Sequence, residues 1–132
     1  MKYSKSVQCI DIGNTRTSIG NYENGIITRH SHIPTIDLIE KKAKILSPLL
    51  KYDIPVSYCS VVPSAEMELI KFAEDNYLKV FNLNISTVKK LPINYEFPDQ
   101  IGQDRLANSL AVYLSHDLPC IVLDIGTATT FD

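Results

Sequence analysis

The first third of the chain alternates apolar and polar residues in a way that predicts β-strands. A short apolar run over residues 7–10 ends at Asp11, and a loosely alternating stretch runs from Thr15 to Tyr22. Asn24-Gly25 comes next, and both residues tolerate the positive φ of a tight hairpin turn. A third strand is predicted from Ile26 to His30, so the three strands should form an antiparallel meander.

The remaining pattern alternates between helical and strand periods. Helices are predicted over residues 36–50, 63–73 and 102–116, with Pro48 ending or kinking the first. Buried strands are predicted over residues 55–62 and 119–124, and a short strand over residues 80–83. Residues 84–101 carry two prolines and little periodicity, which indicates a loop. Strands that alternate with helices after a meander favour an α/β fold with a mixed sheet.

Composition narrows the function classes. The chain has 132 residues, of which 45% are hydrophobic and 21% charged, and its net charge is −2. This balance is typical of a globular domain and argues against a disordered chain or a nucleic-acid binder. No apolar run is long enough for a membrane span, and no signal peptide follows Met1. The three cysteines lie in or beside apolar runs, which predicts buried, inert thiols and a cytoplasmic location.

One short pattern occurs twice, at Cys9–Thr17 and at Val122–Thr130. Each copy is an apolar strand, an aspartate, a glycine two residues later, and then hydroxyl-bearing residues. The carboxylate is a hard ligand for a cation, and the glycine lets the backbone approach a ligand closely. Hydroxyls and backbone N–H groups can hold phosphate oxygens. A single copy would indicate only a turn, but two facing copies would clamp the phosphates of a nucleotide.

A second constellation, Gly102–Arg105, opens the last predicted helix. Asp104 falls in the first helical turn, where the helix dipole favours a charged carboxylate. Such a carboxylate beside a hydroxyl nucleophile would serve as the base in phosphoryl transfer, and Arg105 offers a fork for an anionic group. The alternative from spacing alone is a helix-capping aspartate with a surface arginine.

His30 and His32 alternate on the third predicted strand and could share a face. With no third ligand nearby, we interpret both as surface histidines rather than as a metal site.

Four stretches in a specific order carry a family resemblance: Asp11–Thr15, Val61–Pro63, Gly102–Asn108 and Asp124–Asp132. Together they are similar to the N-terminal half of a type III pantothenate kinase, the bacterial class that includes Bvg accessory factor-like proteins. The resemblance implies an RNase H-like fold of the actin/hexokinase/Hsp70 type, with a mixed five-stranded sheet flanked by helices. It implies one lobe over residues 1–117 and the start of a truncated second lobe over residues 118–132.

The resemblance also implies roles for individual residues. ATP would contact Asp11, Ile12, Gly13, Asn14, Thr15, Arg16, Thr17, Ser18 and Thr127. Pantothenate would contact Tyr95, Gly102, Gln103, Asp104 and Arg105. Asp104 is the implied proton acceptor, and Asp124 is the implied potassium ligand. Tyr95 could instead simply cover the edge of the core.

The implied reaction is ATP-dependent phosphorylation of the 4′-hydroxyl of pantothenate, the first step towards coenzyme A. Mg²⁺ and a monovalent cation, K⁺ or NH₄⁺, would take part, and the full-length protein would form a homodimer. Because family members are about twice as long, we expect this chain alone to be weakly active or inactive. The alternative is a non-catalytic regulatory or binding module on the same scaffold. A kinase of another hydroxylated substrate is a weaker alternative, against which Gly-x-Asp-Arg argues.

Overall fold

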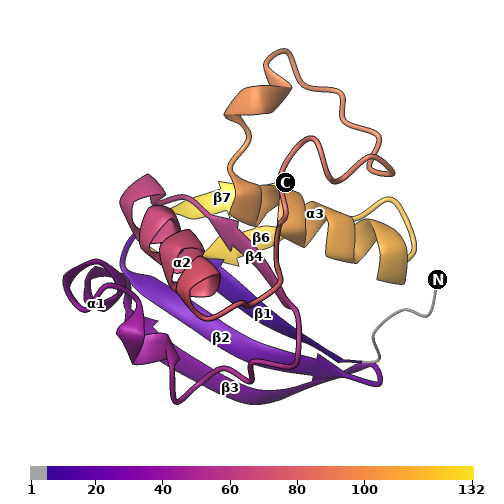
Figure 1. Ribbon diagram of the computed structural model, residues 1–132. Helices are drawn as coiled ribbons and strands as arrows, with labels where there is room; N and C mark the ends of the chain where they lie inside the picture. The colour runs from indigo at the N-terminus through magenta and orange to yellow at the C-terminus, as the bar shows by residue number, and fades with distance from the viewer. Residues whose placement is uncertain (1–5) are drawn as a thin grey trace. The chain divides into compact units, whose positions relative to one another are not determined.

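The computed structural model describes residues 6–132 (Figure 1). The chain divides between Asn82 and Leu83 into two compact units, which are described separately. The boundary predicted after residue 117 is not tested by this division and stays a prediction.

Over its described residues, 6–82, the first unit contains five strands and two α-helices. They are β1 (Ser6–Ile12), β2 (Arg16–Glu23), β3 (Ile26–Pro34), α1 (Thr35–Glu40), β4 (Val56–Ser60), α2 (Pro63–Asp75) and β5 (Val80–Asn82). A short 3-10 helix, Lys44–Leu46, lies between α1 and β4.

The five strands form one mixed sheet in the order β3-β2-β1-β4-β5. The pairs β1–β2 and β2–β3 are antiparallel, whereas β1–β4 and β4–β5 are parallel. Asn24 and Gly25 adopt φ values of 51° and 88° in the turn between β2 and β3, as a tight hairpin requires. The predicted meander and the mixed five-stranded sheet are confirmed.

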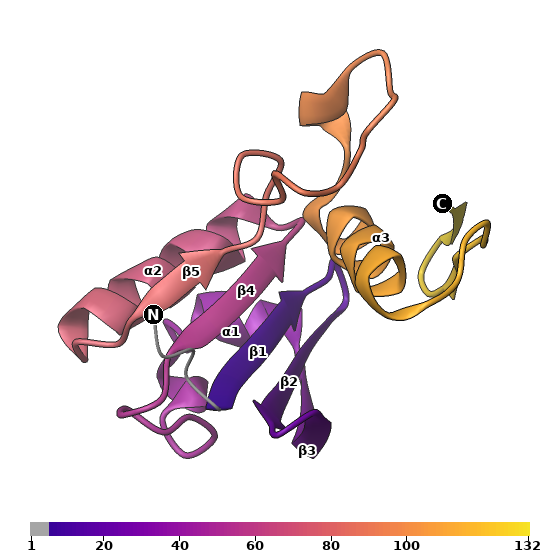
Figure 2. The ribbon, with the colours of Figure 1, turned by 90° about the vertical axis from the view of Figure 1, so that its right-hand side faces the viewer.

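One face of this sheet carries the hydrophobic core. Alternate residues of β1 point to this face, where Gln8, Ile10 and Ile12 are buried. Figures 1 and 2 show α1 and α2 on the same face of the sheet, and Leu38 and Leu69 of these helices belong to the core cluster. The opposite face of β1 carries Val7, Cys9 and Asp11, which are less buried.

The continuous helix predicted over residues 36–50 is wrong. The helix ends at Glu40, and the chain then turns through Lys42 and Ala43 at φ values of 50° and 55°. The N–H of Ala43 donates to the carbonyl of Leu38 at 2.7 Å, and the N–H of Lys42 donates to that of Ile39 at 3.3 Å. These two bonds form a Schellman motif, which closes a helix without a proline. The apolar residues beyond the turn, including Leu46 and Leu50, still enter the same core.

Gln8 is a fully buried amide whose hydrogen bonds tie β1 to the loop before β4. Its Nε2 donates to the carbonyls of Lys51 at 2.8 Å and Ile54 at 3.0 Å. Its Oε1 accepts from the N–H of Lys51 at 2.6 Å. This one side chain therefore satisfies three backbone groups, and it fixes the start of β1 against that loop.

A second polar contact on the core face joins β4 to α2. The hydroxyl of Tyr58 donates to Glu66 Oε1 at 3.1 Å. Burial, helped by the nearby negative charge of Glu66, raises the pKa of Tyr58 to about 12.

The second unit contains α3 (Gln103–Ser115) and a two-stranded hairpin of β6 (Leu123–Ile125) and β7 (Thr129–Phe131). A loop is predicted over residues 84–101, and the structure has one over residues 83–102, with a short 3-10 helix at Pro98–Gln100. The buried strand predicted over residues 119–124 is wrong, because β6 begins at Leu123 and Ile121 and Leu123 are 79% and 52% exposed.

The cysteines are free thiols with different exposure. Cys59 is buried, and burial raises the pKa of the Cys9 thiol, as expected for inert groups. Cys120 is exposed, so the expectation of a buried thiol is wrong there. Among residues 6–132, no helix combines the length and the apolar character needed to cross a bilayer.

We predict that Gln8→Met destabilises the protein, because methionine keeps the side chain's shape but leaves three backbone groups without partners. The cost should be about 1–3 kcal/mol. Urea unfolding would measure it, with Gln100→Met, at an exposed position, as the matched control. An unchanged unfolding midpoint would refute the role assigned to Gln8.

We also predict a loss of stability at alkaline pH that depends on Tyr58. Its ordinary pKa is 10.0 and its folded-state pKa is about 12, so the folded state retains the proton longer than the unfolded state does. The contribution of this shift to the free energy of unfolding is present below pH 10 and declines as the pH rises towards 12. Urea unfolding across this range should show a shallower decline for Tyr58→Phe than for the wild type.

Candidate active site

The two copies of the sequence repeat both form β-hairpins. In the first, Asp11 lies one residue before the end of β1 and pairs with Ser18 of β2. In the second, Asp124 lies in β6 and pairs with Thr130 of β7. Each aspartate thus stands opposite a hydroxyl-bearing residue, next to a glycine turn.

The two turns differ by one residue. Four residues separate the last paired positions of the first hairpin, Ile12 and Thr17, whereas three separate Ile125 and Thr129. The N–H of Gly13 donates to the carbonyl of Arg16 at 3.1 Å, while the N–H of Gly126 donates to that of Ala128 at 3.0 Å. The second hairpin therefore closes more tightly than the first.

A buried chain of hydroxyls supports the first turn from behind. Thr35 Oγ1 donates to the carbonyl of Gly13 at 2.6 Å, and the Oγ1 atoms of Thr17 and Thr35 lie 3.0 Å apart. Because the Gly13 carbonyl can only accept, Thr17 must donate to Thr35. The N–H of Thr35 also donates to the carbonyl of Thr15 at 3.0 Å, so the turn is fixed to the start of α1.

The residues predicted to contact ATP divide into outward and inward positions. The side chains of Asp11, Asn14, Thr15 and Arg16 are exposed, and Gly13 and Ser18 are partly exposed. In contrast, Ile12 and Thr17 are fully buried in the core face. These two positions can offer a ligand only their backbone groups.

A polar row crosses the sheet at the level of Asp11. Cys59 of β4 donates its S–H to Asp11 Oδ1 at 3.3 Å. On the other side of β1, Ser18 Oγ lies 3.2 Å from Nδ1 of His32 on β3. The sequence indicated only a surface histidine at position 32, whereas the strand register places it next to a predicted phosphate contact.

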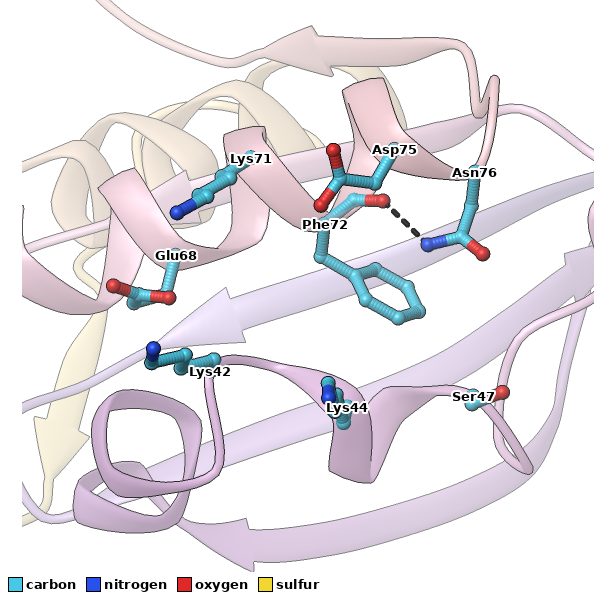
Figure 3. A pocket seen from close by; sticks show the side chains of 8 residues that line it. All are labelled: Lys42, Lys44, Ser47, Glu68, Lys71, Phe72, Asp75 and Asn76. Atoms are coloured by element: carbon cyan, nitrogen blue, oxygen red, sulfur yellow. Dashed lines mark hydrogen bonds between the residues drawn. The ribbon is translucent and has the colours of Figure 1, made fainter.

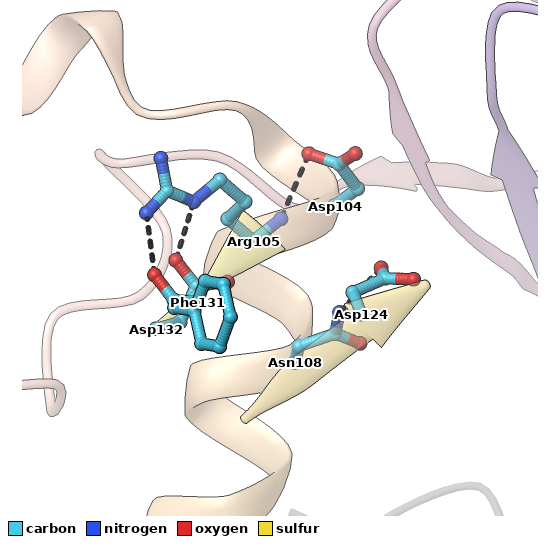
Figure 4. A network of polar contacts seen from close by, with 6 residues as sticks. All are labelled: Asp104, Arg105, Asn108, Asp124, Phe131 and Asp132. Atoms are coloured by element: carbon cyan, nitrogen blue, oxygen red, sulfur yellow. Dashed lines mark hydrogen bonds and ion pairs between the residues drawn. The ribbon is translucent and has the colours of Figure 1, made fainter. Parts of the chain in front are cut away.

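In the second unit, α3 brings two predicted site residues together. Gly102 is the N-cap, and Asp104 lies in the first turn, where its Oδ1 accepts from the N–H of Arg105 at 2.8 Å. Asn108 lies one turn further on the same side of the helix as Asp104. Its Nδ2 donates to Asp124 Oδ2 at 3.2 Å, which holds the Asp124 carboxylate beside the helix (Figure 4).

Arg105 ties the end of the second hairpin to α3. Its Nε forms an ion pair with Asp132, and a terminal guanidinium nitrogen donates to the carbonyl of Phe131 at 3.2 Å (Figure 4). This structural role was not expected from the sequence. The predicted contact of Arg105 with pantothenate stays a prediction.

The remaining predicted residues lie in turns and loops. Tyr95 is 55% exposed in the loop before α3, and Thr127 is exposed in the turn between β6 and β7. Gln103 is the first residue of α3. Asp11–Ser18 belong to the first unit and Tyr95, Gly102–Arg105, Asp124 and Thr127 to the second.

Sequence reasoning missed Asn108 and Asp132. The signal for Asn108 was its spacing of four residues from Asp104, which places both on one face of a helix. The signal for Asp132 was strand alternation, because Asp132 is paired with Val122 and shares the hairpin face of Asp124.

The donor atoms near the predicted site residues are mainly oxygens. Among the residues that the structure describes, no group of three or more His, Cys, Asp and Glu side chains could hold a metal ion. The carboxylate of Asp124, with the amide of Asn108 beside it, suits a hard cation that takes carbonyl and water oxygens as its other ligands.

A pocket of about 500 Å³ lies in the first unit, between α2 and the segment that follows α1 (Figure 3). Its lining mixes cations and carboxylates, and it includes none of the residues predicted from the sequence. The lining residues are Lys42, Lys44, Ser47, Glu68, Lys71, Phe72, Asp75 and Asn76. The residues predicted for the active site lie elsewhere, in the two hairpins and at the start of α3.

Comparison with known families decides what these motifs belong to. The family model described as type III pantothenate kinase matches residues 8–132. The chain belongs to the type III pantothenate kinase family. A type III pantothenate kinase of Methylacidiphilum infernorum is 32% identical over 124 residues, covering 93% of this chain and 44% of the relative. One from an Anaeromyxobacter species is 35% identical over 136 residues, covering 93% of this chain and 52% of the relative.

The chain thus spans about half the length of the curated type III pantothenate kinases that it matches. Among solved structures, a Bacteroides thetaiotaomicron protein with an actin-like ATPase fold and unknown function aligns with a TM-score of 0.44 at 12% identity. That alignment covers 59% of this chain and 32% of the other.

We predict that alanine at the two repeat glycines has unequal effects. A Cβ at position 13 would lie 3.0 Å from the carbonyl oxygen of Arg16, whereas a Cβ at position 126 would come no closer than 3.8 Å to a neighbour. Gly13→Ala should therefore open its turn at a cost of about 1 kcal/mol or more, and Gly126→Ala should change stability by less than about 0.5 kcal/mol. Amide hydrogen exchange at both turns is the measurement, and equal effects would contradict the geometry.

Proposed function

We propose that the protein transfers the γ-phosphoryl group of ATP to the 4′-hydroxyl of pantothenate, the step that commits pantothenate to coenzyme A. The observation that carries this proposal is the family match over residues 8–132, which includes both hairpins and the start of α3. Phosphoryl transfer needs little covalent chemistry from a protein, because positioning and charge stabilisation do most of the work.

The hairpin turns would hold the phosphates of ATP. The first turn presents Asn14 and Thr15 outward, and the hydroxyl chain behind it holds the Gly13 carbonyl, which keeps the shape of the turn rigid. Thr127 would make the corresponding contact from the second turn. Such preorganised donors need no rearrangement when charge shifts between the phosphoryl oxygens.

Asp104 would act as the base. As the 4′-oxygen of pantothenate forms its bond to the γ-phosphorus, the hydroxyl proton would pass to the Asp104 carboxylate and ADP would leave. One carboxylate oxygen, Oδ1, accepts from the N–H of Arg105, which orients the group. Pantothenate would also contact Tyr95, Gly102, Gln103 and Arg105.

The cations would be held by oxygen ligands. Asp11 would face the Mg²⁺ that accompanies the nucleotide, and Asp124, oriented by Asn108, would hold K⁺ or NH₄⁺. These cations would supply positive charge that offsets the negative charge of the phosphates.

The complete enzyme would need more than these residues. Because the relatives are about twice as long, a second lobe would complete the nucleotide site, and we propose a cytoplasmic homodimer as the working form. The 132-residue chain alone should turn over slowly or not at all.

We predict that Asp104→Asn lowers kcat by about 10²–10⁴-fold, the usual contribution of general base catalysis. Asparagine keeps an oxygen that can accept from the N–H of Arg105, so the helix start should be preserved. A coupled ADP-release assay with pantothenate, ATP and K⁺ is the measurement, made on this chain and on one that continues through the second lobe.

Asp99→Asn is the matched control, since Asp99 is an exposed carboxylate in the short 3-10 helix just before α3. It should retain wild-type turnover. If the longer wild-type chain shows no turnover with saturating substrates, the kinase proposal fails and a non-catalytic binding role takes its place.

A further inference from the structure

The contact between Ser18 and His32 depends on a β-bulge. Before the bulge, Asn21 pairs with Thr28, and after it Ile19 pairs with Ser31 and Ser18 with His32. The extra residue on β3 is accommodated near Arg29, which adopts a φ of 51°. Without it Ser31 would stand opposite Ser18, and His32 would point to the core face.

The bulge therefore puts an imidazole on the same sheet face as Asp11 and Ser18. Ser18 Oγ and His32 Nδ1 are 3.2 Å apart, within hydrogen-bond distance. His32 is exposed on the edge strand, and Ser18 is partly exposed, so both remain accessible to a ligand on this face.

The direction of this hydrogen bond determines what Ser18 can offer a ligand. When Nδ1 carries no proton, it accepts the Ser18 hydroxyl proton, and only lone pairs of Oγ face outward. When Nδ1 is protonated it donates to Oγ, and the Ser18 proton becomes available to another acceptor. A phosphate oxygen can only accept, so it favours the second arrangement.

We propose that His32 is a positioning residue that sets the Ser18 hydroxyl as a donor to a phosphate oxygen of ATP, so that ATP binds more tightly when Nδ1 carries a proton. This inference rests on the proposed ATP site and adds to it a residue outside the repeat motif. His32 acts through Ser18, without contacting the nucleotide.

The surroundings of His32 set the pH at which this switch works. The ring of His30 on the same strand lies 4.3 Å away between centroids, and Arg16 lies on β2. Desolvation first, and then the charges of His30 and Arg16, lower the pKa of His32. Asp11 lies on β1, which is separated from β3 by β2. Helix α1 covers the opposite face of the sheet, and its Asp37 forms an ion pair with Lys41. In the neutral ring the proton can lie on either nitrogen, whereas the imidazolium always carries one on Nδ1, and the imidazolium becomes the major form only on the acidic side of pH 6.5.

The test is isothermal titration of Mg-ATP from pH 5.5 to 8.5 (about one unit below to two above the ordinary histidine pKa) into this chain and into one that continues through the second lobe. Wild-type Kd should fall by about tenfold towards acidic pH, the scale of one hydrogen bond to a charged group. Ionisation of the nucleotide contributes equally to every variant, so His32→Asn gives the baseline and should lack the extra dependence.

Two further variants separate the hydrogen bond from simple charge attraction. Ser18→Ala keeps the imidazole charge but should lose most of the extra pH dependence. His30→Asn is the matched control: it leaves Ser18 and His32 in place but removes one repelling charge, and it should move the midpoint to higher pH with the amplitude retained. By linkage, NMR titration should also show that ATP raises the pKa of His32.

The outcomes distinguish this inference from the proposed function. If the wild type binds ATP and Ser18→Ala keeps the full pH dependence, or if the wild type has none beyond the His32→Asn baseline, the switch is refuted and the ATP site stands. If neither wild-type chain binds ATP at any pH while amide exchange shows both folded, the ATP site and the switch are both refuted.

Discussion

The central position of β1 determines where the chemistry of the first unit lies. β1 pairs antiparallel with β2 and parallel with β4, so its register is fixed from both sides. A slip of one residue would bury Asp11 and expose Ile12, at a large hydrophobic cost. The buried amide of Gln8 fixes the other end of the same strand through three backbone hydrogen bonds. Core packing and the placement of the first aspartate are thus consequences of one constraint.

The second unit relies on polar contacts rather than on a large core. Two side chains of α3, Arg105 and Asn108, hold the β6–β7 hairpin through Asp132 and Asp124. A two-stranded hairpin is marginally stable by itself, so these contacts carry much of its orientation. Arg105 would consequently combine a structural task with any role in substrate binding, and its replacement would disturb Asp124 as well as the substrate.

Local signals predicted most of the fold. The Asn24-Gly25 turn and the alternation around it specify the meander, because both residues accept the positive φ that the turn requires. Helix 36–50 was mispredicted because its apolar spacing continues past Glu40, whereas the Schellman motif at Lys42 and Ala43 carries no glycine to indicate it. The site was predictable as a set of motifs, but the pairing of His32 with Ser18 depends on a bulge that no residue type identifies. Likewise, Asn108 and Asp124 are sixteen residues apart, and only the folded hairpin joins them.

The hairpin of β6 and β7 has two unlike sides. Its inner side carries the carboxylates held by α3, while Leu123, Ile125 and Phe131 on the outer side are 52%, 75% and 68% exposed. Because the hairpin is a single layer, a tilt imposed on its apolar side also moves its acidic side. The geometry of the proposed cation site at Asp124 would therefore depend on what packs against these three side chains, on the side of the hairpin away from the ligand.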